Sequence, residues 1–257
     1  MLSPTPVALC VLSWEAVYQL SKLAVRTYVE PTEANKKLRR DAASYIVALI
    51  HAGIMGTRGP WHMLALINAP VGAKLAMPGA GSPWVAAASS VETTNLLFLS
   101  WLLYDLLHLG LAFPKLGGAD SVAHHVGFIC ASLVCGLHEI FPFPFAWLIS
   151  GELSSILLNI RWLLINSGRG DTRALLAANN TFVVLFFATR VVGYGAGLAH
   201  LWVVRDHLRQ LDDVVARPLL LVVLTLVVGG FGLNLMWMFK IVQMLRARPR
   251  GKEKRAE

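Results

Sequence analysis

Ten ionisable side chains interrupt the apolar segments of this chain, and histidine is the most frequent among them. They are Asp105, His108, His124, His125, His138, Glu139, Glu152, Arg161, Arg190 and His200. An ionisable group is costly inside a hydrocarbon layer, so each one is a candidate for function. Histidine exchanges protons near neutral pH, and a carboxylate can orient an imidazole or stabilise its charged form. The set could therefore perform acid–base catalysis or bind a polar group.

Two short spacings stand out in this set. Asp105 and His108 lie three residues apart on one expected helix, so they share a face. His124 and His125 are adjacent and about 100° apart around a helix, so both can border one cavity. We take Asp105, His124, His125 and Glu152 as the catalytic candidates. The alternative is that these side chains only tie helices together through hydrogen bonds.

A polar stripe follows in the segment 152–161. Glu152, Ser155 and Asn159 recur at helical spacing and share a face, with Arg161 nearby. Such residues also serve as hydrogen-bonding links between membrane helices. Arg190 lies inside another apolar segment and needs an acidic or carbonyl partner, for which Glu152 or Asp105 is the natural choice.

The predicted substrate-binding residues are His108, Asn159, Arg161 and Arg190. The chain has no HExxH sequence, and its three cysteines show no metal-ligand spacing. We therefore predict no metal and no resident cofactor.

The composition indicates which kind of secondary structure positions these residues. Of the 257 residues, 56% are hydrophobic and 15% are charged, and the mean hydropathy is +0.58. Soluble domains carry about 25% charged residues. A disordered protein, a coiled coil and an ordinary soluble enzyme are excluded. One crossing takes roughly 20 apolar residues as a helix, so the length allows up to about seven crossings. We predict an all-α membrane protein.

The apolar pattern predicts seven helices, which cover about 5–25, 42–57, 91–112, 122–141, 145–166, 174–203 and 217–245. The first has no basic residues before Lys22 and is predicted to be a retained helix rather than a signal peptide. Four prolines break the connector 58–90 into short pieces, some of them helical. The Phe-Pro-Phe-Pro stretch 141–144 is so short that its two flanking helices are predicted to form an antiparallel hairpin.

The basic residues predict the orientation and exclude one class of partner. The net charge is +8, with basic clusters at 26–40 and 246–255. If the N-terminus is lumenal, the loops and tail on the cytosolic side hold 14 Lys and Arg and those on the other side hold 5. This bias predicts a cytosolic C-terminus. Nucleic acid is not an expected partner, because no soluble domain remains to bind it.

The polar residues, taken in chain order, resemble the TLC family, named for the TRAM, Lag1 and CLN8 proteins. The matching pieces are Arg39-Arg40-Asp41 with Ser44, His51-Ala52, Tyr104-Asp105, His124-His125, Glu152-Leu-Ser-Ser, Asn159-Ile-Arg161-Trp162, Asn179 or Asn180, and Phe186-Phe187-Ala-Thr-Arg190. The resemblance covers about 38–246. It implies a barrel of six membrane helices around a central cavity, preceded here by an N-terminal helix and basic loop in 1–37 and followed by a basic tail in 247–257.

The resemblance also implies a role in lipid metabolism at the endoplasmic reticulum or a related membrane. One branch, the ceramide synthases, transfers an acyl group from acyl-CoA to a sphingoid amine and uses its paired histidines. In the helix after that pair its signature has two aspartates and a glutamate, where this chain has Glu152, Ser155 and Asn159. Two carboxylates are lost, so the chain is closer to the small TLC-domain-containing proteins, which are linked to membrane phospholipid composition.

Two functions stay open at this point. In the first, the protein binds or senses a membrane lipid in a polar intramembrane cavity and acts in lipid homeostasis. In the second, it is an acyltransferase, either ceramide synthase-like or acting on lysophospholipids, that uses acyl-CoA as co-substrate and the His124–His125 pair. Both use the same residues, so the sequence does not decide whether the protein is an enzyme. The oligomeric state is not predicted. The C-terminal Lys254-Arg255-Ala256-Glu257 is similar to a dilysine-type retrieval signal, and an ordinary positive tail is the alternative.

Overall fold

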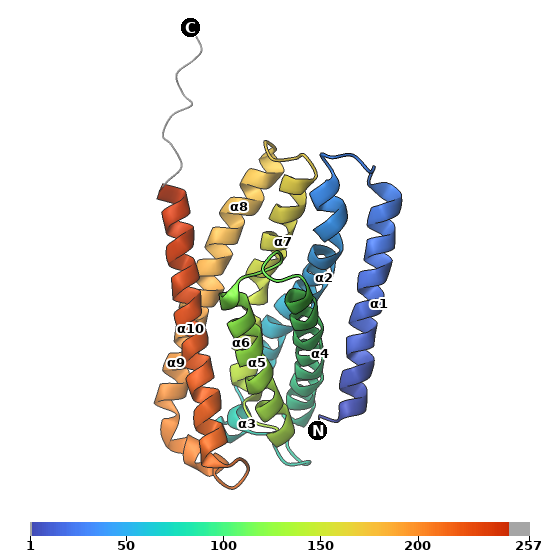
Figure 1. Cartoon of the computed structure of the whole chain (residues 1–257). Coiled ribbons are helices and arrows are strands. Elements are labelled where there is room, and N and C mark those ends of the chain that lie inside the picture. Colours follow the sequence, from blue (N-terminus) through green and yellow to red (C-terminus); the bar gives the residue numbers. More distant parts are fainter. Residues whose placement is uncertain (1, 247–257) are drawn as a thin grey trace.

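The computed structural model describes residues 2–246, and these are almost entirely helical (Figure 1). The elements are α1 (Pro4–Tyr28), α2 (Lys36–Leu66), α3 (Val71–Leu75), α4 (Val85–Leu111), α5 (Ala119–His138), α6 (Pro142–Ile149), α7 (Glu152–Asn166), α8 (Arg173–Phe186), the π-helix η1 (Phe187–Gly193), α9 (Tyr194–Val203), the 3-10 helix η2 (Arg205–Leu211) and α10 (Arg217–Arg246). The predicted basic tail 247–257 lies outside the described residues.

Five of the described helical stretches are long and apolar enough to cross a membrane. They are Val85–Leu111, Ala119–His138, Pro142–Asn166, Arg173–Val203 and Arg217–Arg246. The predicted class, an all-α membrane protein, is confirmed. The helices α1 and α2 are long enough to cross a bilayer, but they carry more polar and charged residues. The number of seven crossings therefore stays a prediction.

The long helices pack side by side around a common centre (Figure 1). Each helix contacts the next in a closed series: α2 contacts α4, α4 contacts α5, and α5 contacts α10. The series continues from α10 to η1, from η1 to α8 and from α8 to α7, and α7 contacts α2. The helix α1 packs outside this series, against α2 and α4. Polar side chains on the inner faces of α4, α5, α7 and η1 can therefore meet, although they are far apart in the chain.

The second helix is longer than the sequence predicted. We expected it to cover about 42–57 and placed Pro60 in the connector that follows, but α2 continues through this proline to Leu66. Proline removes one backbone donor and disturbs one turn, and membrane helices tolerate it when neighbouring groups compensate. The predicted connector 58–90 consequently shrinks to 67–84, and this segment contains the short helix α3.

The Phe-Pro-Phe-Pro stretch begins α6 instead of forming a simple hairpin turn. Phe141, which precedes the helix, has a left-handed backbone with φ 62°, and its amide donates to the carbonyl of Leu75 at 2.7 Å. From there α6 packs against α2, α3, α4 and α9, while α5 packs against α4 and α10. The predicted antiparallel hairpin of the two flanking helices is therefore wrong, because each finds its main partners elsewhere.

Two glycines let α2 approach α6 and α7 closely. A Cβ atom at Gly56 would lie 2.9 Å from the backbone nitrogen of Leu153, and one at Gly59 would lie 2.6 Å from that of Ser150. Any larger residue would push the helices apart, since the obstacle is backbone. This close approach fixes the start of α7, where Glu152 projects toward the centre of the helix bundle.

Candidate functional site

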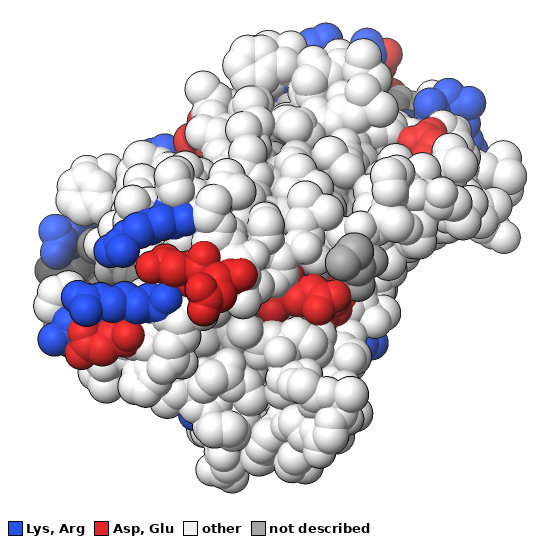
Figure 2. Space-filling model, turned by 90° about the horizontal axis from the view of Figure 1, so that it is seen from below, with Lys and Arg blue, Asp and Glu red and all other residues white. Residues whose placement is uncertain are grey.

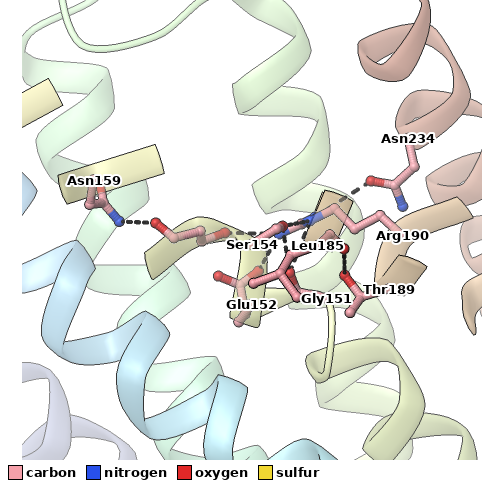
Figure 3. A network of polar contacts seen from close by, with 9 residues as sticks. Gly151, Glu152, Ser154, Asn159, Leu185, Thr189, Arg190 and Asn234 are labelled. Carbon is pink, nitrogen blue, oxygen red and sulfur yellow. Dashed lines mark hydrogen bonds and ion pairs between the residues drawn. The ribbon is translucent and has the colours of Figure 1, made fainter. Parts of the chain in front are cut away.

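Arg190 is the centre of a polar network that joins η1, α7 and α10 (Figure 3). Its Nη2 donates to Glu152 Oε1 at 2.7 Å and to Ser155 Oγ at 2.9 Å. Its Nε donates to Ser154 Oγ at 3.0 Å and to the Gly151 carbonyl at 3.2 Å. The guanidinium therefore binds the first turn of α7 through four separate acceptors.

The same side chain reaches a third helix. Arg190 Nη1 lies 3.5 Å from Asn234 Oδ1 on α10, opposite the α7 contacts (Figure 3). Of the two acidic partners that the sequence suggested for Arg190, the structure selects Glu152. The side chains of both are largely buried, with exposed fractions of 11% for Arg190 and 15% for Glu152. Since most of its donors are occupied, Arg190 acts first as a link between helices.

Arg190 lies on a π-helical segment that the sequence did not reveal. The expected helix 174–203 is continuous, but its middle part, Phe187–Gly193, is η1. A π segment adds a residue to the turn and is frequently found at functional sites. It shifts the face on which subsequent residues project.

His125 is held at both ring nitrogens. Nδ1 lies 2.9 Å from the Ser121 carbonyl oxygen, one turn earlier in α5. Nε2 lies 2.9 Å from Asp105 Oδ2 on α4, as an ion-pair contact that is not aligned as a hydrogen bond. Because both nitrogens face acceptors on the protein, His125 has no open position from which to take a proton from a substrate.

His124 has the opposite environment. Its ring lies against Phe128 and Trp237, at centroid distances of 4.6 and 5.3 Å. Its Nδ1 is buried and has no hydrogen-bond partner among residues 2–246. The rings of His124 and His125 are 5.7 Å apart and nearly perpendicular, at 77°. The adjacent histidines thus border one region, as expected, but Asp105 contacts only one of them.

A cavity of about 480 Å³ lies beside these residues. Its polar lining includes His124, His125, Glu152, Arg161 and Arg190. Aromatic and aliphatic side chains of α4, α7, α8 and α10 form most of the remaining wall. Pockets that bind small molecules commonly have about 300–1,000 Å³ and a mainly apolar lining with few polar groups. This cavity has the size and composition of a site for an amphiphilic molecule.

A second, narrow space of about 40 Å³ adjoins the first. Phe98, His124, Glu152 and Arg190 line both spaces, so these four residues form the boundary between them. Beyond the boundary the lining is largely apolar and includes the aromatic residues Phe128, Phe145 and Tyr194. The polar network therefore forms the floor of the larger cavity.

The start of α5 is tied to the end of α10 near the other side of the cavity. Asp120 Oδ2 accepts a hydrogen bond from Trp237 Nε1 at 3.1 Å and lies 3.5 Å from Lys240 Nζ. Both Trp237 and Lys240 line the cavity. Nothing in the local sequence indicates these contacts, because both partners of Asp120 lie on α10, far along the chain.

Two predicted substrate-binding residues lie away from the cavity lining. His108 Nε2 is 2.8 Å from Glu15 Oε2 on α1, and its ring lies 4.5 Å from that of Tyr18. Asn159 is buried and donates to the Ser155 carbonyl of its own helix. The expected pairing of Asp105 with His108 is wrong, because Asp105 turns toward α5 and His108 toward α1. Asn159 lies further along α7 than the residues that contact Arg190, about two helical turns after Glu152 (Figure 3).

His51 is a buried histidine that the sequence did not single out for the site. Its side chain is fully buried, and neither ring nitrogen has a hydrogen-bond partner in the described chain. The ring stacks on Trp101 at 3.6 Å, and Trp101 lies in the cavity wall, 5.7 Å from the His125 ring. In the sequence, only the place of His51 in the family pattern indicated that it belongs to the site.

These features define a helical membrane protein with a polar floor inside an apolar cavity. The sequence model of the TLC domain (TRAM, LAG1 and CLN8) matches residues 41–243. The chain therefore belongs to the TLC domain family, and the resemblance seen in the ordered motifs is confirmed. The N-terminal helix α1 precedes the matched region. Neither the curated proteins nor the solved structures gave a match to this chain.

Proposed function

We propose that the protein binds a membrane lipid in the cavity between α4, α5, α7, α8 and α10, and that it acts in this way in membrane lipid homeostasis. Membership of the TLC domain family supports a role in lipid metabolism or sensing in a membrane. The observation that carries the proposal is the cavity of about 480 Å³, apolar along most of its wall and polar at its floor.

The contacts of the polar residues favour binding over catalysis. In a Ser-His-Asp type of arrangement, the carboxylate holds one nitrogen of the histidine and leaves the other open toward the substrate. Here Asp105 holds His125, but the second nitrogen of His125 faces the Ser121 carbonyl. Arg190 is also engaged by Glu152 and two serines. The floor is thus a fixed polar surface against which part of a lipid can rest.

The alternative, acyl transfer, relies on His124. This residue lines the cavity and makes no hydrogen bond in the described part of the chain, so it is the histidine available to accept a proton. An amine or hydroxyl would give its proton to His124 and attack the thioester carbonyl of acyl-CoA. The new amide or ester would form as the thiolate leaves and takes up a proton. No carboxylate contacts His124 in the described chain to assist this role.

A large side chain in the cavity should prevent lipid binding. Val183 lines the cavity, whereas its neighbour Val184 is 64% exposed on the outer side of α8. We expect Val183→Trp to reduce the binding of a fluorescent lipid to the purified protein by about tenfold or more, because the indole occupies the space of the hydrocarbon chain. Val184→Trp adds the same group toward the lipid side and should leave binding unchanged. Equal binding by the two variants would contradict the proposed site.

We also propose a position in the endoplasmic reticulum with a cytosolic C-terminus. The basic residues near the loops at 29–35 and 167–172 and in the tail support this orientation. At the opposite end, acidic and basic side chains lie side by side (Figure 2), and Arg217 there lies 3.5 Å from Asp212. We expect a C-terminal tag to be digested by protease added to sealed microsomes. A tag that is cut only after detergent is added would reverse the orientation.

A further inference from the structure

Arg161 is the basic residue of the cavity lining that lacks an acidic partner in the described chain. Three lining residues carry a fixed positive charge: Arg161, Arg190 and Lys240. Arg190 is paired with Glu152 at 2.7 Å, and Lys240 lies 3.5 Å from Asp120. Arg161 donates through Nε to Asn179 Oδ1 at 2.7 Å, and its two terminal nitrogens bond to nothing among residues 2–246.

The contact with Asn179 fixes how Arg161 is presented. An arginine near the end of a membrane helix can otherwise extend its flexible side chain to the interface. Here the Nε contact holds the base of the guanidinium on α8, and Arg161 remains in the cavity wall. The terminal nitrogens provide donors in a planar fork, which suits two oxygens of a phosphate or carboxylate group.

The depth of Arg161 distinguishes it from the polar floor. Nine residues separate it from Glu152 on α7, which is about 13 Å along a helix. Lys240, Met244 and Leu245 line the same cavity from the last turns of α10. Between this level and the floor the wall includes Phe182, Val183 and Phe186. The cavity therefore has a cationic end near the ends of α7 and α10 and an apolar middle.

We propose that the cavity takes an amphiphile whose phosphate group lies against Arg161 and whose hydrocarbon chain extends along the apolar wall toward the polar floor. This inference rests on the proposed lipid-binding function and names the chemical class of its ligand. An arginine held in a mainly apolar wall without an acidic partner is costly, and an anionic ligand supplies the missing charge. Phosphate is favoured over carboxylate because this end of the lining has further donors for its additional oxygens. They are Lys240, which has one acidic neighbour, and the exposed Asn180.

The test compares probes that share one oleoyl chain and differ in the polar group. They are lysophosphatidate, monoolein and oleate, each measured for binding to the purified full chain in detergent. We expect lysophosphatidate to bind about tenfold more tightly than monoolein or oleate, since a charge-assisted contact contributes about that factor. Arg161→Gln should abolish this preference without changing the affinity for monoolein. Arg173→Gln, at an exposed arginine outside the cavity lining, should retain it.

Competition with inorganic phosphate distinguishes a site for free phosphate from a site for a phosphate group carried by a lipid. Displacement of lysophosphatidate by excess phosphate would show that the phosphate group alone is recognised, and failure to displace it would assign the site to phosphate carried by a lipid. Equal affinities of the unmodified protein for the three probes, tighter binding of oleate, or an unchanged preference in Arg161→Gln would overturn the proposal.

A second variant and a second lipid allow each result to be assigned either to the phosphate inference or to the proposed lipid binding. If Arg161→Gln does not fold, Arg161→Lys keeps the charge but loses the fork, and a weakened but present preference is then expected. If monoolein binds without any preference for phosphate, the phosphate inference fails and lipid binding stands. If none of the probes binds, and a chain-matched diacyl lipid does not bind either, the proposed function itself fails.

Discussion

Glu152→Gln is expected to lower the free energy of unfolding by about 3–5 kcal/mol, which is the typical cost of removing one partner of a buried ion pair. The change leaves Arg190 with a positive charge and no carboxylate, at a position where only 11% of its side chain is exposed. Because Arg190 also holds Asn234 on α10, the loss should loosen the contact between α7, η1 and α10. Titration with SDS in mixed micelles measures the effect.

A double-mutant cycle separates the ion pair from the loss of volume. We expect Glu152→Gln and Arg190→Gln to be strongly destabilising alone, and the double variant to be far more stable than the sum of the two predicts. Glu30→Gln removes the same charge from an exposed position beyond α1 and should leave stability unchanged. Additive losses in the double variant would show that the pair contributes no coupling.

The two adjacent histidines should respond differently to replacement by glutamine. His125 faces acceptors at both nitrogens, so His125→Gln should cost about 1–3 kcal/mol of stability. His124 has no hydrogen-bond partner among residues 2–246 and contributes through its ring contacts with Phe128 and Trp237, so His124→Gln should cost less stability than His125→Gln. Under the lipid-binding proposal, the effect of His124→Gln on lipid affinity should be about tenfold or less.

The same pair of variants decides between binding and acyl transfer. A histidine that acts as general base contributes about 10²–10⁴-fold to a rate. If purified protein forms an acylated product from acyl-CoA, and His124→Gln lowers its formation by that factor with lipid affinity unchanged, the acyltransferase alternative holds. If the double glutamine variant restores normal phospholipid and sphingolipid profiles in cells that lack the protein, catalysis by this pair is excluded.

The fold could be predicted in outline from hydropathy, with errors at two places. Apolar segments of helical length predicted the five long apolar helices, because a segment in lipid must satisfy its own backbone hydrogen bonds. Pro60 was placed in the connector 58–90, but α2 passes through it. The stretch 141–144 was read as a tight hairpin, whereas α6 packs against α2. Local sequence does not contain the neighbours that decide these two cases.

The sequence by itself determined which residues must avoid lipid. Asp105, His124, His125, Glu152 and Arg190 each interrupt an apolar helix, and the cost of exposing a polar group to hydrocarbon requires them to face the interior. The preference for a lipid-related family also followed from the sequence, because the order of these residues along the chain is itself the family pattern.

Only the tertiary structure decided which of these residues meet. Asp105 and His108 are about 60° apart on α4, so each can lean toward a different neighbour, and α5 and α1 flank α4. Asp105 therefore contacts His125, and His108 contacts Glu15. Likewise, the π turn at η1 and the glycines of α2 bring Arg190 and Glu152 together and leave Arg161 facing the cavity. Such pairings depend on the approach of helices distant in the chain, which no spacing along one helix can encode.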